Sequence, residues 1–511
     1  MADFGILGFG AYLPQKRISR KSIFDAIGWI NASLKPFAKG ARAYANWDED
    51  PITMGVAAAQ ACLAHAPQEV EAQTLCFAST TAPFLDRQNA GIIAAALDLP
   101  KQTHCYDFSG SQRAALSALI VASQNPKTRL LLTAAEQTPI RAASTMEILC
   151  GDAAAALLIG EGKPLAKLHG TKTIYADFVD HYRTANAKTD YVLEERWYRD
   201  EGLVKFAPQA ILPLLEEAGI EAAQIAHFIA PVANPALARH IAAAVNIKPT
   251  ALADSLFDTC GYAGAAHALL MLVQVLEKAK AGDWILATAF GQGCEAILLQ
   301  ATDAITDIAK HKTEKQGAIT HTLQDQLAQG IIENNYTKFL AASGRLDIDW
   351  GMRAERDNRT AQSVAYAKSR ALYGFIGGIC SACQTPQFPK SHYCVNPECG
   401  ALDTQTDYSF ARRLARVKSF TEDWLAFTRD PPLIYGNLSF EGGGNIFMEM
   451  TGCETGEIAI GDLVAMQFRI KDIDTVRDFK RYFWKAVPVR IGKVEKETGK
   501  ERTKSKGGGH G

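Results

Sequence analysis

The chain has 511 residues, of which 48% are hydrophobic and 21% are charged, and its formal net charge is −1. A nearly neutral chain is not suited to neutralising a phosphate backbone, which argues against nucleic acid as its partner. There is no apolar run of about 18 residues and no basic segment before an apolar stretch at the N-terminus. These features predict a cytoplasmic protein that binds no membrane.

Eleven cysteines occur in the chain, and four of them fall within residues 380–399. The other seven lie in apolar or small-residue surroundings. This distribution favours reduced thiols and one metal site over a disulfide framework.

Residues 1–302 alternate short apolar runs with Ala-rich helical windows. The runs Thr74–Ser79, Arg129–Thr133 and His227–Ala230 are typical of buried strands. Alternating strands and helices predict an α/β layered fold for this part of the chain.

This part also contains an internal duplication. A glycine turn followed by an apolar strand occurs at Gly151–Ile159 and again at Gly291–Leu299. Each copy is preceded by a helix without a polar face, at Ala114–Ser123 and Ala263–Leu276. Such helices must be buried on all sides, which predicts two halves, 1–165 and 166–302, whose central helices face each other. The alternative is two ordinary core helices.

The remaining sequence changes character at residue 303. Residues 303–370 are polar with helical spacing and predict a helical linker. The segment 371–405 contains the four cysteines, and 406–492 has the short strands and Gly-rich turns of a small β-barrel. The Lys/Glu-rich end, 493–511, is expected to be disordered.

The cysteine cluster predicts a structural zinc site. Its ligands are Cys380, Cys383, Cys394 and Cys399. Two such pairs can place four thiolates tetrahedrally around one zinc ion and leave no position open for catalysis. Metal binding would also supply the folding energy that so short a segment lacks.

Several motifs of the first 302 residues resemble the hydroxymethylglutaryl-CoA synthase and ketoacyl-ACP synthase III branch of the thiolase superfamily. They are Gly8–Pro14, Asn46–Met54 and Gly151–Ala155. The resemblance implies a duplicated thiolase-like fold with α-β-α-β-α layers, an acyl-CoA substrate, and a homodimer that buries roughly 2,000 Å² or more through its central strands.

The C-terminal part resembles the zinc-ribbon/OB-fold family that partners thiolase-like proteins. Besides the four cysteines, the motifs are Gln387–Pro389, Val417–Thr421, Tyr435–Gly436 and Phe440–Gly442. We interpret its OB-fold barrel as a lid or bridge near the CoA tunnel. A pathway enzyme is a further candidate partner.

The reactive residues of the synthase branch do not carry over. The nucleophilic cysteine lies five positions after an aspartate there, and counting from Asp107 that position is Gln112. Likewise, the positions of the catalytic histidine, asparagine and glutamate hold Pro231, Tyr262 and Thr80. A carboxamide cannot attack a thioester, so the sequence predicts chemistry without an acyl-cysteine.

The chemistry that remains is an aldol or retro-aldol reaction on a 3-hydroxyacyl-CoA thioester, with an aldehyde or ketone as the second reactant. It needs an acid/base and donors for an enolate oxygen. Tyr262 is the first candidate, because a helix N-terminus is expected to lower its pKa. The second candidate is the cluster that contains Asp180, His181 and Glu195, and the alternative for its members is a solvated loop. Gly261, Gly291 and Gly293 are the candidate positions for backbone N–H donors.

Two other functions remain open for this chain. One is a hydroxymethylglutaryl-CoA synthase-like or thiolase-like acyltransferase with a displaced cysteine, such as Cys105, Cys150 or Cys294, although each is typical of a small buried hydrophobe. The other is a non-catalytic scaffold that binds acyl-CoA. Arg17 and Arg42 are candidate contacts for the CoA phosphates.

Overall fold

The computed structural model describes residues 3–66, 71–307 and 321–490, so the predicted disordered tail lies outside the described residues. Nine strands form one hydrogen-bonded sheet in the order β11-β12-β13-β8-β1-β7-β6-β4-β5. In that order their bounds are Ile225–Ile229, Trp284–Phe290, Gly293–Ala301, Ala166–Tyr175, Asp3–Tyr12, Ala153–Gly162, Leu130–Glu136, Thr74–Ala78 and His104–Phe108. The strands expected from the apolar runs are confirmed as β4, β6 and β11.

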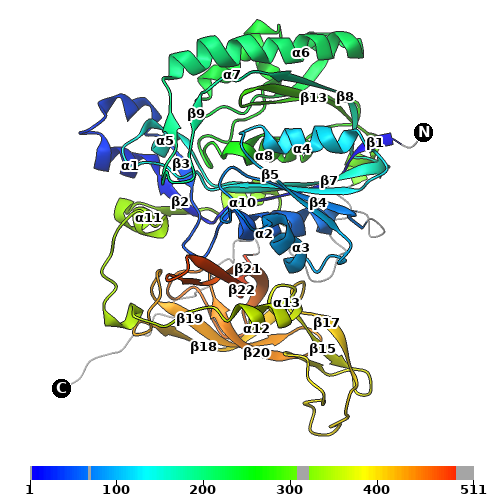
Figure 1. The fold of residues 1–511 in the computed structure, drawn as a ribbon, viewed down its shortest axis with the longest axis vertical. Coiled ribbons are helices and arrows are strands. Elements are labelled where there is room, and N and C mark those ends of the chain that lie inside the picture. Colours follow the sequence, from blue (N-terminus) through cyan, green and yellow to red (C-terminus); the bar gives the residue numbers. More distant parts are fainter. Residues whose placement is uncertain (1–2, 67–70, 308–320, 491–511) are drawn as a thin grey trace, which may run out of the picture.

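The sheet folds into two layers because β1 and β8 share only the pairs Gly5–Lys167 and Ile6–Ala166. Figure 1 shows α4 (Ala114–Ser123) and α8 (Gly264–Leu276) between these layers. Helices α6 (Val204–Ala218) and α7 (Ala236–Ala244) cover the upper layer, and α2 (Pro51–His65) and α3 (Asn89–Ala96) cover the lower one (Figure 1). The predicted α-β-α-β-α order is therefore confirmed.

The two central helices meet as the sequence predicts, with one difference. Every residue of α8 is buried. In α4, by contrast, Val121 is 52% exposed, so this helix is not buried on all sides as expected. The difference arises because α4 lies beside β5, the edge strand of the sheet, and has no further strand beyond it. Tyr106 on β5 is also 52% exposed, and the homodimer stays a prediction.

Peripheral elements complete this part. Helix α1 (Arg20–Ile27) follows β2 (Lys16–Ser19), which pairs with β3 (Ala41–Ala43). A two-stranded hairpin, β9 (His181–Tyr182) with β10 (Tyr191–Val192), and the short helix α5 (Thr145–Leu149) lie near the central helices.

The linker is less helical than predicted. It contains α10 (Leu323–Ala328), α11 (Tyr336–Ala342), α12 (Gln362–Ala367) and α13 (Ser369–Leu372). Between them, β14 (Ile331–Glu333) adds a parallel strand beside β2. The linker contacts both parts of the chain, since β14 pairs with β2 while Arg353 donates to Leu425 O and the Thr360 N–H donates to Asp474 of the barrel. Its helices therefore alternate with extended segments.

The C-terminal part consists of two small β units. The ribbon has β15 (Ile376–Cys380), β16 (Pro386–Gln387) and β17 (Gln405–Ser409). The closed barrel follows the order β18-β19-β20-β22-β21, with bounds Ala415–Asp423, Leu433–Phe440, Asn445–Met450, Phe479–Pro488 and Leu463–Asp474. This five-stranded order is that of the predicted OB-fold.

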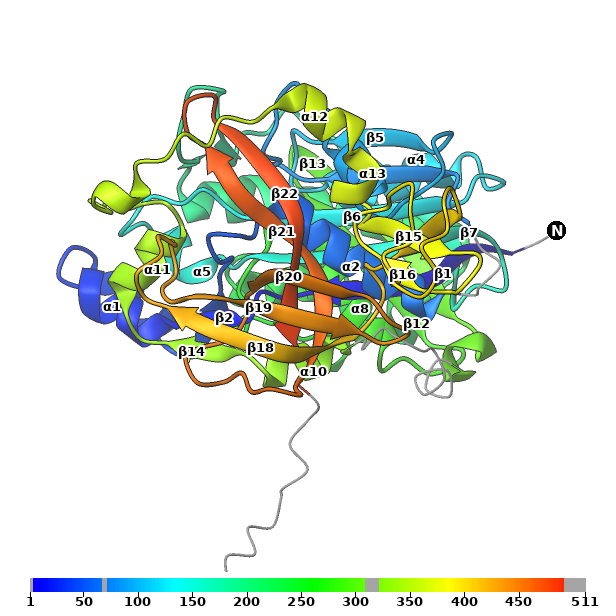
Figure 2. The same cartoon turned by 90° about the horizontal axis from the view of Figure 1, so that it is seen from below.

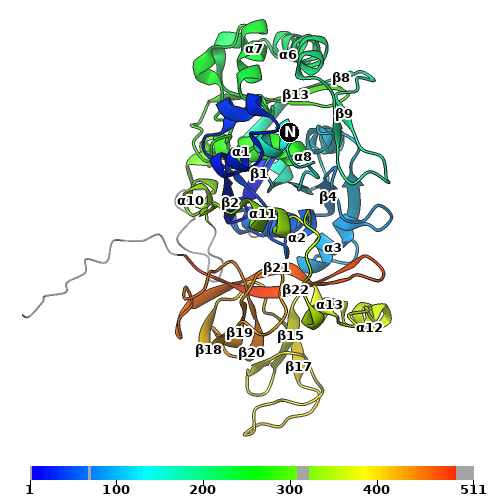
Figure 3. The same cartoon turned by 90° about the vertical axis from the view of Figure 1, so that its left-hand side faces the viewer.

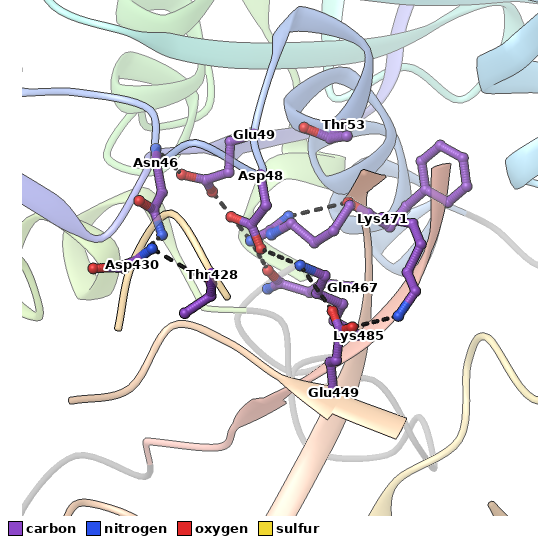
Figure 4. A network of polar contacts seen from close by, with 12 residues as sticks. Asn46, Asp48, Glu49, Thr53, Thr428, Asp430, Glu449, Gln467, Lys471 and Lys485 are labelled. Atoms are coloured by element: carbon purple, nitrogen blue, oxygen red, sulfur yellow. Dashed lines mark hydrogen bonds and ion pairs between the residues drawn. The ribbon is translucent and has the colours of Figure 1, made fainter. Parts of the chain in front are cut away.

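Strands β21 and β22 hold the barrel against α2, as Figures 2 and 3 show from below and from the side. Figure 4 shows the polar network at this contact. Lys485 of β22 lies 3.1 Å from Asp48 and 3.3 Å from Glu449, while Arg469 of β21 lies 3.1 Å from Glu49. Lys485, Asp48 and Arg469 are each at most 3% exposed.

The same contact reaches the start of α2. Asp50 caps this helix by accepting the Thr53 N–H at 3.0 Å, and its other oxygen accepts the Tyr482 hydroxyl at 2.8 Å. Asn46–Met54, one of the motifs that indicated the superfamily, therefore also forms the docking site of the barrel.

Replacing Lys485 with alanine should lower the free energy of unfolding by about 3–5 kcal/mol, because the buried Asp48 carboxylate loses its lysine partner and the half-buried Glu449 keeps only Lys471. Chemical denaturation measures the change. Lys418→Ala is the matched control, since Lys418 is an exposed lysine on β18. Equal stability of the two variants would show that the network does not hold the barrel in place.

Candidate functional site

A cavity of about 800 Å³ lies where the chain enters α4, α7 and α8, facing the β9–β10 hairpin. Apolar side chains form part of its wall, and ionisable ones form the rest. The polar and ionisable residues that matter below are Gln112, Arg141, Cys150, Asp180, His181, Arg183, Glu195, Tyr198, Asn234 and Tyr262. The structure thus brings Gln112 together with all four predicted acid/base candidates.

Four of these side chains form a continuous hydrogen-bonded series. The Tyr262 hydroxyl donates to Gln112 Oε1 at 3.2 Å, and Gln112 Nε2 lies 3.2 Å from His181 Nε2. On its other side, His181 Nδ1 lies 2.9 Å from Asp180 Oδ2. Gln112 belongs to the turn before α4 and Tyr262 precedes α8 by two residues, so the two central helices bring these side chains into contact.

Local backbone geometry fixes Tyr262 in this position. Tyr262 forms a bridge with Cys150, and its N–H donates to Leu149 O at 3.0 Å. Gly261 has a φ of +92°, and a Cβ there would lie 2.7 Å from Cys150 O. Only glycine permits so close an approach of the two backbones.

The hydrogen bonds define the tautomer of His181. The amide nitrogen of Gln112 can only donate, so His181 Nε2 must accept and Nδ1–H must donate to Asp180. Burial lowers the pKa of His181, but the hydrogen bond and charge of Asp180, followed by the charges of Asp190 and Glu136, outweigh it and raise the pKa above its ordinary value. His181 is therefore oriented and charge-stabilised as a proton acceptor.

Tyr262 differs from the expectation. We expected the helix N-terminus to lower its pKa, but burial raises the pKa well above its ordinary value, and nearby Tyr198, Cys150, Asp180 and Glu136 add to the rise. Burial outweighs the helix dipole because the phenol lies among neutral and negative groups. Tyr262 is consequently a proton donor in its resting state.

Glu195 lies at the rim of the cavity. Its side chain is exposed and accepts a hydrogen bond from Asn234 Nδ2 at 3.1 Å. In the part of the chain that the structure describes, no hydrogen bond or ion pair joins Glu195 to the Tyr262–Gln112–His181–Asp180 series, which sets it apart from the other three candidates. Glu195 is better placed to contact a ligand at the entrance.

The three predicted backbone donors have a different environment. The Gly261 N–H donates to Leu256 O at 3.1 Å and the Gly291 N–H donates to Gly293 O at 3.0 Å. Gly293 pairs with Tyr175 in the sheet. The observed conformation therefore lends no support to the oxyanion prediction for Gly261, Gly291 and Gly293.

The cysteines outside the ribbon are poor candidate nucleophiles. Cys150 lines the cavity, but burial raises the pKa of its thiol to about 12. Burial also raises the pKa of Cys294 to about 12 and that of Cys105, which lies on the edge strand β5. A neutral thiol is a weak nucleophile.

Two further expectations were wrong. Arg17 and Arg42 are each only 2% exposed, and Arg42 donates to Glu147 O and lies 3.6 Å from Asp152. Neither guanidinium can therefore reach a CoA phosphate. Arg141 is a better candidate, since it is exposed at the cavity and has no side-chain partner among the described residues.

Sequence reasoning missed Glu136, a carboxylate at the end of β6 that is 0% exposed. It accepts hydrogen bonds from Thr80 N at 3.1 Å and Thr80 Oγ1 at 3.0 Å. Thr80 is the position of the absent family glutamate, so a carboxylate from the neighbouring strand lies beside that position. The only signal in the sequence was an acidic residue that ends an otherwise uncharged strand.

The ribbon cysteines form a separate centre. The sulfur atoms of Cys380, Cys383, Cys394 and Cys399 all lie within 4.8 Å of one another. The Cys383–Cys394 and Cys380–Cys399 sulfur distances are 3.5 and 3.9 Å, close to the ~3.8 Å expected around a tetrahedral zinc ion with four thiolates. The donor set and its geometry fit structural zinc.

Two segments match known families. Residues 215–300 match the C-terminal domain of 3-oxoacyl-[acyl-carrier-protein] synthase III, and residues 368–405 match the rubredoxin-like zinc ribbon domain of ChsH2. The hydroxymethylglutaryl-CoA synthase of Aeropyrum pernix is 28% identical over 318 residues, which cover 59% of this chain and 86% of that protein. The fold of the chain is thiolase-like, and residues 368–405 are similar to the ChsH2 zinc ribbon.

Solved structures support the thiolase-like fold. The structure of hydroxymethylglutaryl-CoA synthase complexed with CoA aligns with a TM-score of 0.56 at 15% identity, over 69% of this chain and 92% of the other. The 3-oxoacyl-(acyl carrier protein) synthase III of Pseudomonas aeruginosa gives 0.52 at 19% identity, over 59% and 98%. Both resemblances seen in the sequence are thus confirmed. Within the described residues, no helix is both long and apolar enough to cross a bilayer.

Metal analysis of the purified thiolase-like protein should find one equivalent of zinc per chain. Cys383→Ser should lose the metal and destabilise the ribbon, because three thiolates remain and the short segment has little core of its own. Cys453→Ser is the control, as this half-buried thiol lies outside the cluster and should leave the zinc content unchanged. Full retention of zinc by Cys383→Ser would contradict the assignment.

Proposed function

We propose that this chain binds a CoA thioester and makes or breaks the bond between its C2 atom and the carbon of an aldehyde or ketone by proton transfer, without an acyl-cysteine. The main support is the Asp180–His181–Gln112–Tyr262 series in the cavity. The relatives named hydroxymethylglutaryl-CoA synthase support a CoA substrate and the bond-forming direction.

Each group has a defined task in the addition direction. His181 Nε2 removes a proton from C2, and Asp180 stabilises the resulting imidazolium, as in other His–Asp pairs. The enolate carbon then attacks the carbonyl carbon, and the Tyr262 hydroxyl donates its proton to the new alkoxide. The imidazolium proton finally restores the phenol, so no proton is gained or lost overall.

Gln112 separates the two groups in the resting site. Its amide hydrogen bonds occupy both His181 Nε2 and the Tyr262 hydroxyl. The thioester must replace this amide at His181, which costs a neutral hydrogen bond of about 1 kcal/mol. Gln112 therefore keeps base and acid apart until a substrate enters.

A second candidate is an acyltransferase that uses a displaced cysteine. The observation that favours it is that Cys150 lines the same cavity as His181. Its raised pKa opposes this role unless substrate binding ionises the thiol. The two candidates differ in one intermediate, a covalent acyl-enzyme.

His181→Gln and Tyr262→Phe should each reduce kcat by about 10²–10⁴-fold, the range typical of removing a general base or acid. Cys150→Ala and Cys105→Ala should retain most activity. Turnover of a panel of CoA thioesters with aldehydes and ketones, in both directions, measures these effects. Labelled acyl-CoA followed by peptide mass spectrometry should detect no acyl group on the protein.

An inactive Cys150→Ala protein with label on Cys150 in the wild type would establish the acyltransferase instead. Binding of acyl-CoA without turnover under any condition would establish a scaffold.

The acid limb of the pH–rate profile should report His181. A base works in its neutral form, so kcat/KM should fall as the pH falls through the pKa of His181, which Asp180 holds above its ordinary value. Asp180→Asn removes that charge, lowers the pKa and should move the acid limb to lower pH while reducing the plateau. An unchanged acid limb in Asp180→Asn would exclude His181 as the titrating base.

A further inference from the structure

Glu136 is a buried carboxylate that the proposed reaction does not use. Its side chain accepts two hydrogen bonds from Thr80 and a third from the Ala265 N–H at 3.3 Å. Among the described residues, no lysine or arginine forms an ion pair with it. Neutral donors and the N-terminal end of α8 therefore hold this carboxylate in place.

Thr80 continues the contact toward the base. Its carbonyl oxygen accepts a hydrogen bond from Arg183 Nη2, and Arg183 Nη1 lies 2.6 Å from Asp190. Arg183 follows His181 by two residues, and Asp190 precedes β10. Arg183 thus clamps both arms of the hairpin that carries His181 to the Thr80 turn.

Ala265 continues the contact toward the acid. It is the second residue of α8, three positions after Tyr262. The carboxylate of Glu136 therefore bonds directly to the helix start whose preceding turn carries the phenol.

Gly264 allows this arrangement. Its φ is +45°, and a Cβ there would lie 2.7 Å from Glu136 Cγ and 2.9 Å from Gln112 Oε1. Because glycine has no Cβ, Glu136 and the Gln112 side chain pack against the same point of the backbone. The Glu136 side chain therefore lies next to Gln112, which links the base His181 to the acid Tyr262.

We propose that Glu136 is a positioning residue that ties the hairpin carrying His181 to the helix start carrying Tyr262. It sets the separation of the two groups without contacting the substrate, because it is fully buried behind Gln112. The inference rests on the proposed function, since it concerns the geometry of that acid/base pair.

In Glu136→Gln, an amide NH₂ faces the Thr80 donors. The hydrogen bonds that connect the hairpin to the start of α8 should therefore be disrupted. The expected result is a fall in kcat on the order of 10–100-fold, as for a displacement of reacting groups by about 1 Å, with KM for the thioester unchanged. Asp474→Asn is the matched control, since Asp474 is an equally buried carboxylate in the barrel. It should leave kcat and KM at wild-type values.

Thr80→Val removes the hydroxyl donor to Glu136 and keeps the Thr80 N–H donor, so it weakens the same connection and serves if Glu136→Gln does not fold. Each single change should lower kcat alone, with the smaller effect in Thr80→Val, and the double variant should lose little more than Glu136→Gln, because both changes act on one connection. Wild-type kcat in either single variant, or a rise in KM at constant kcat, would overturn the positioning role. If His181→Gln and Tyr262→Phe also keep full activity, the proposed function itself fails.

Discussion

The packing of α4 against α8 is the contact on which the site depends. Neither helix offers a continuous polar face, so each buries its apolar surface against the other and against the two sheet layers. Their starting turns consequently come together, and with them Gln112 and Tyr262, which are 150 positions apart in the chain. The hairpin with His181 and Asp180 then packs against these two starting turns, whose positions are already fixed by the core.

Local patterns were enough to predict the strands, the central helices and the cysteine cluster. The periodicity of apolar residues, the apolar runs and the short spacings between cysteines can all be read from residues that are close in the sequence. Tyr262 and the cluster with Asp180 and His181 were predicted as alternative acid/base candidates and not as neighbours, whereas the structure places all three around Gln112. The pKa of Tyr262 could not be predicted from its place before a helix, since it depends on burial by distant segments.

Glu136 is an example of a residue whose role the sequence alone could not predict. Its contact with Thr80 follows from the parallel register of β4 and β6, in which Ala78 pairs with Ala134. That register places two strand ends side by side although 56 residues separate them. In the sequence, Glu136 is only an acidic residue at the end of a strand. The pairing of β4 with β6 makes it a buried neighbour of the site.

The docking of the barrel has a consequence for how the two parts of the chain assemble. Covalent linkage gives tethered domains an effective concentration of about the millimolar range, so the contact needs little intrinsic affinity. The alternating charges of Asp48, Lys485, Glu49 and Arg469 are therefore better understood as a device for orientation, because a rotated or shifted barrel would bury like charges together. The covalent link keeps the barrel close to the α/β part. The buried charges then select one orientation of the barrel among the many that the link alone would allow.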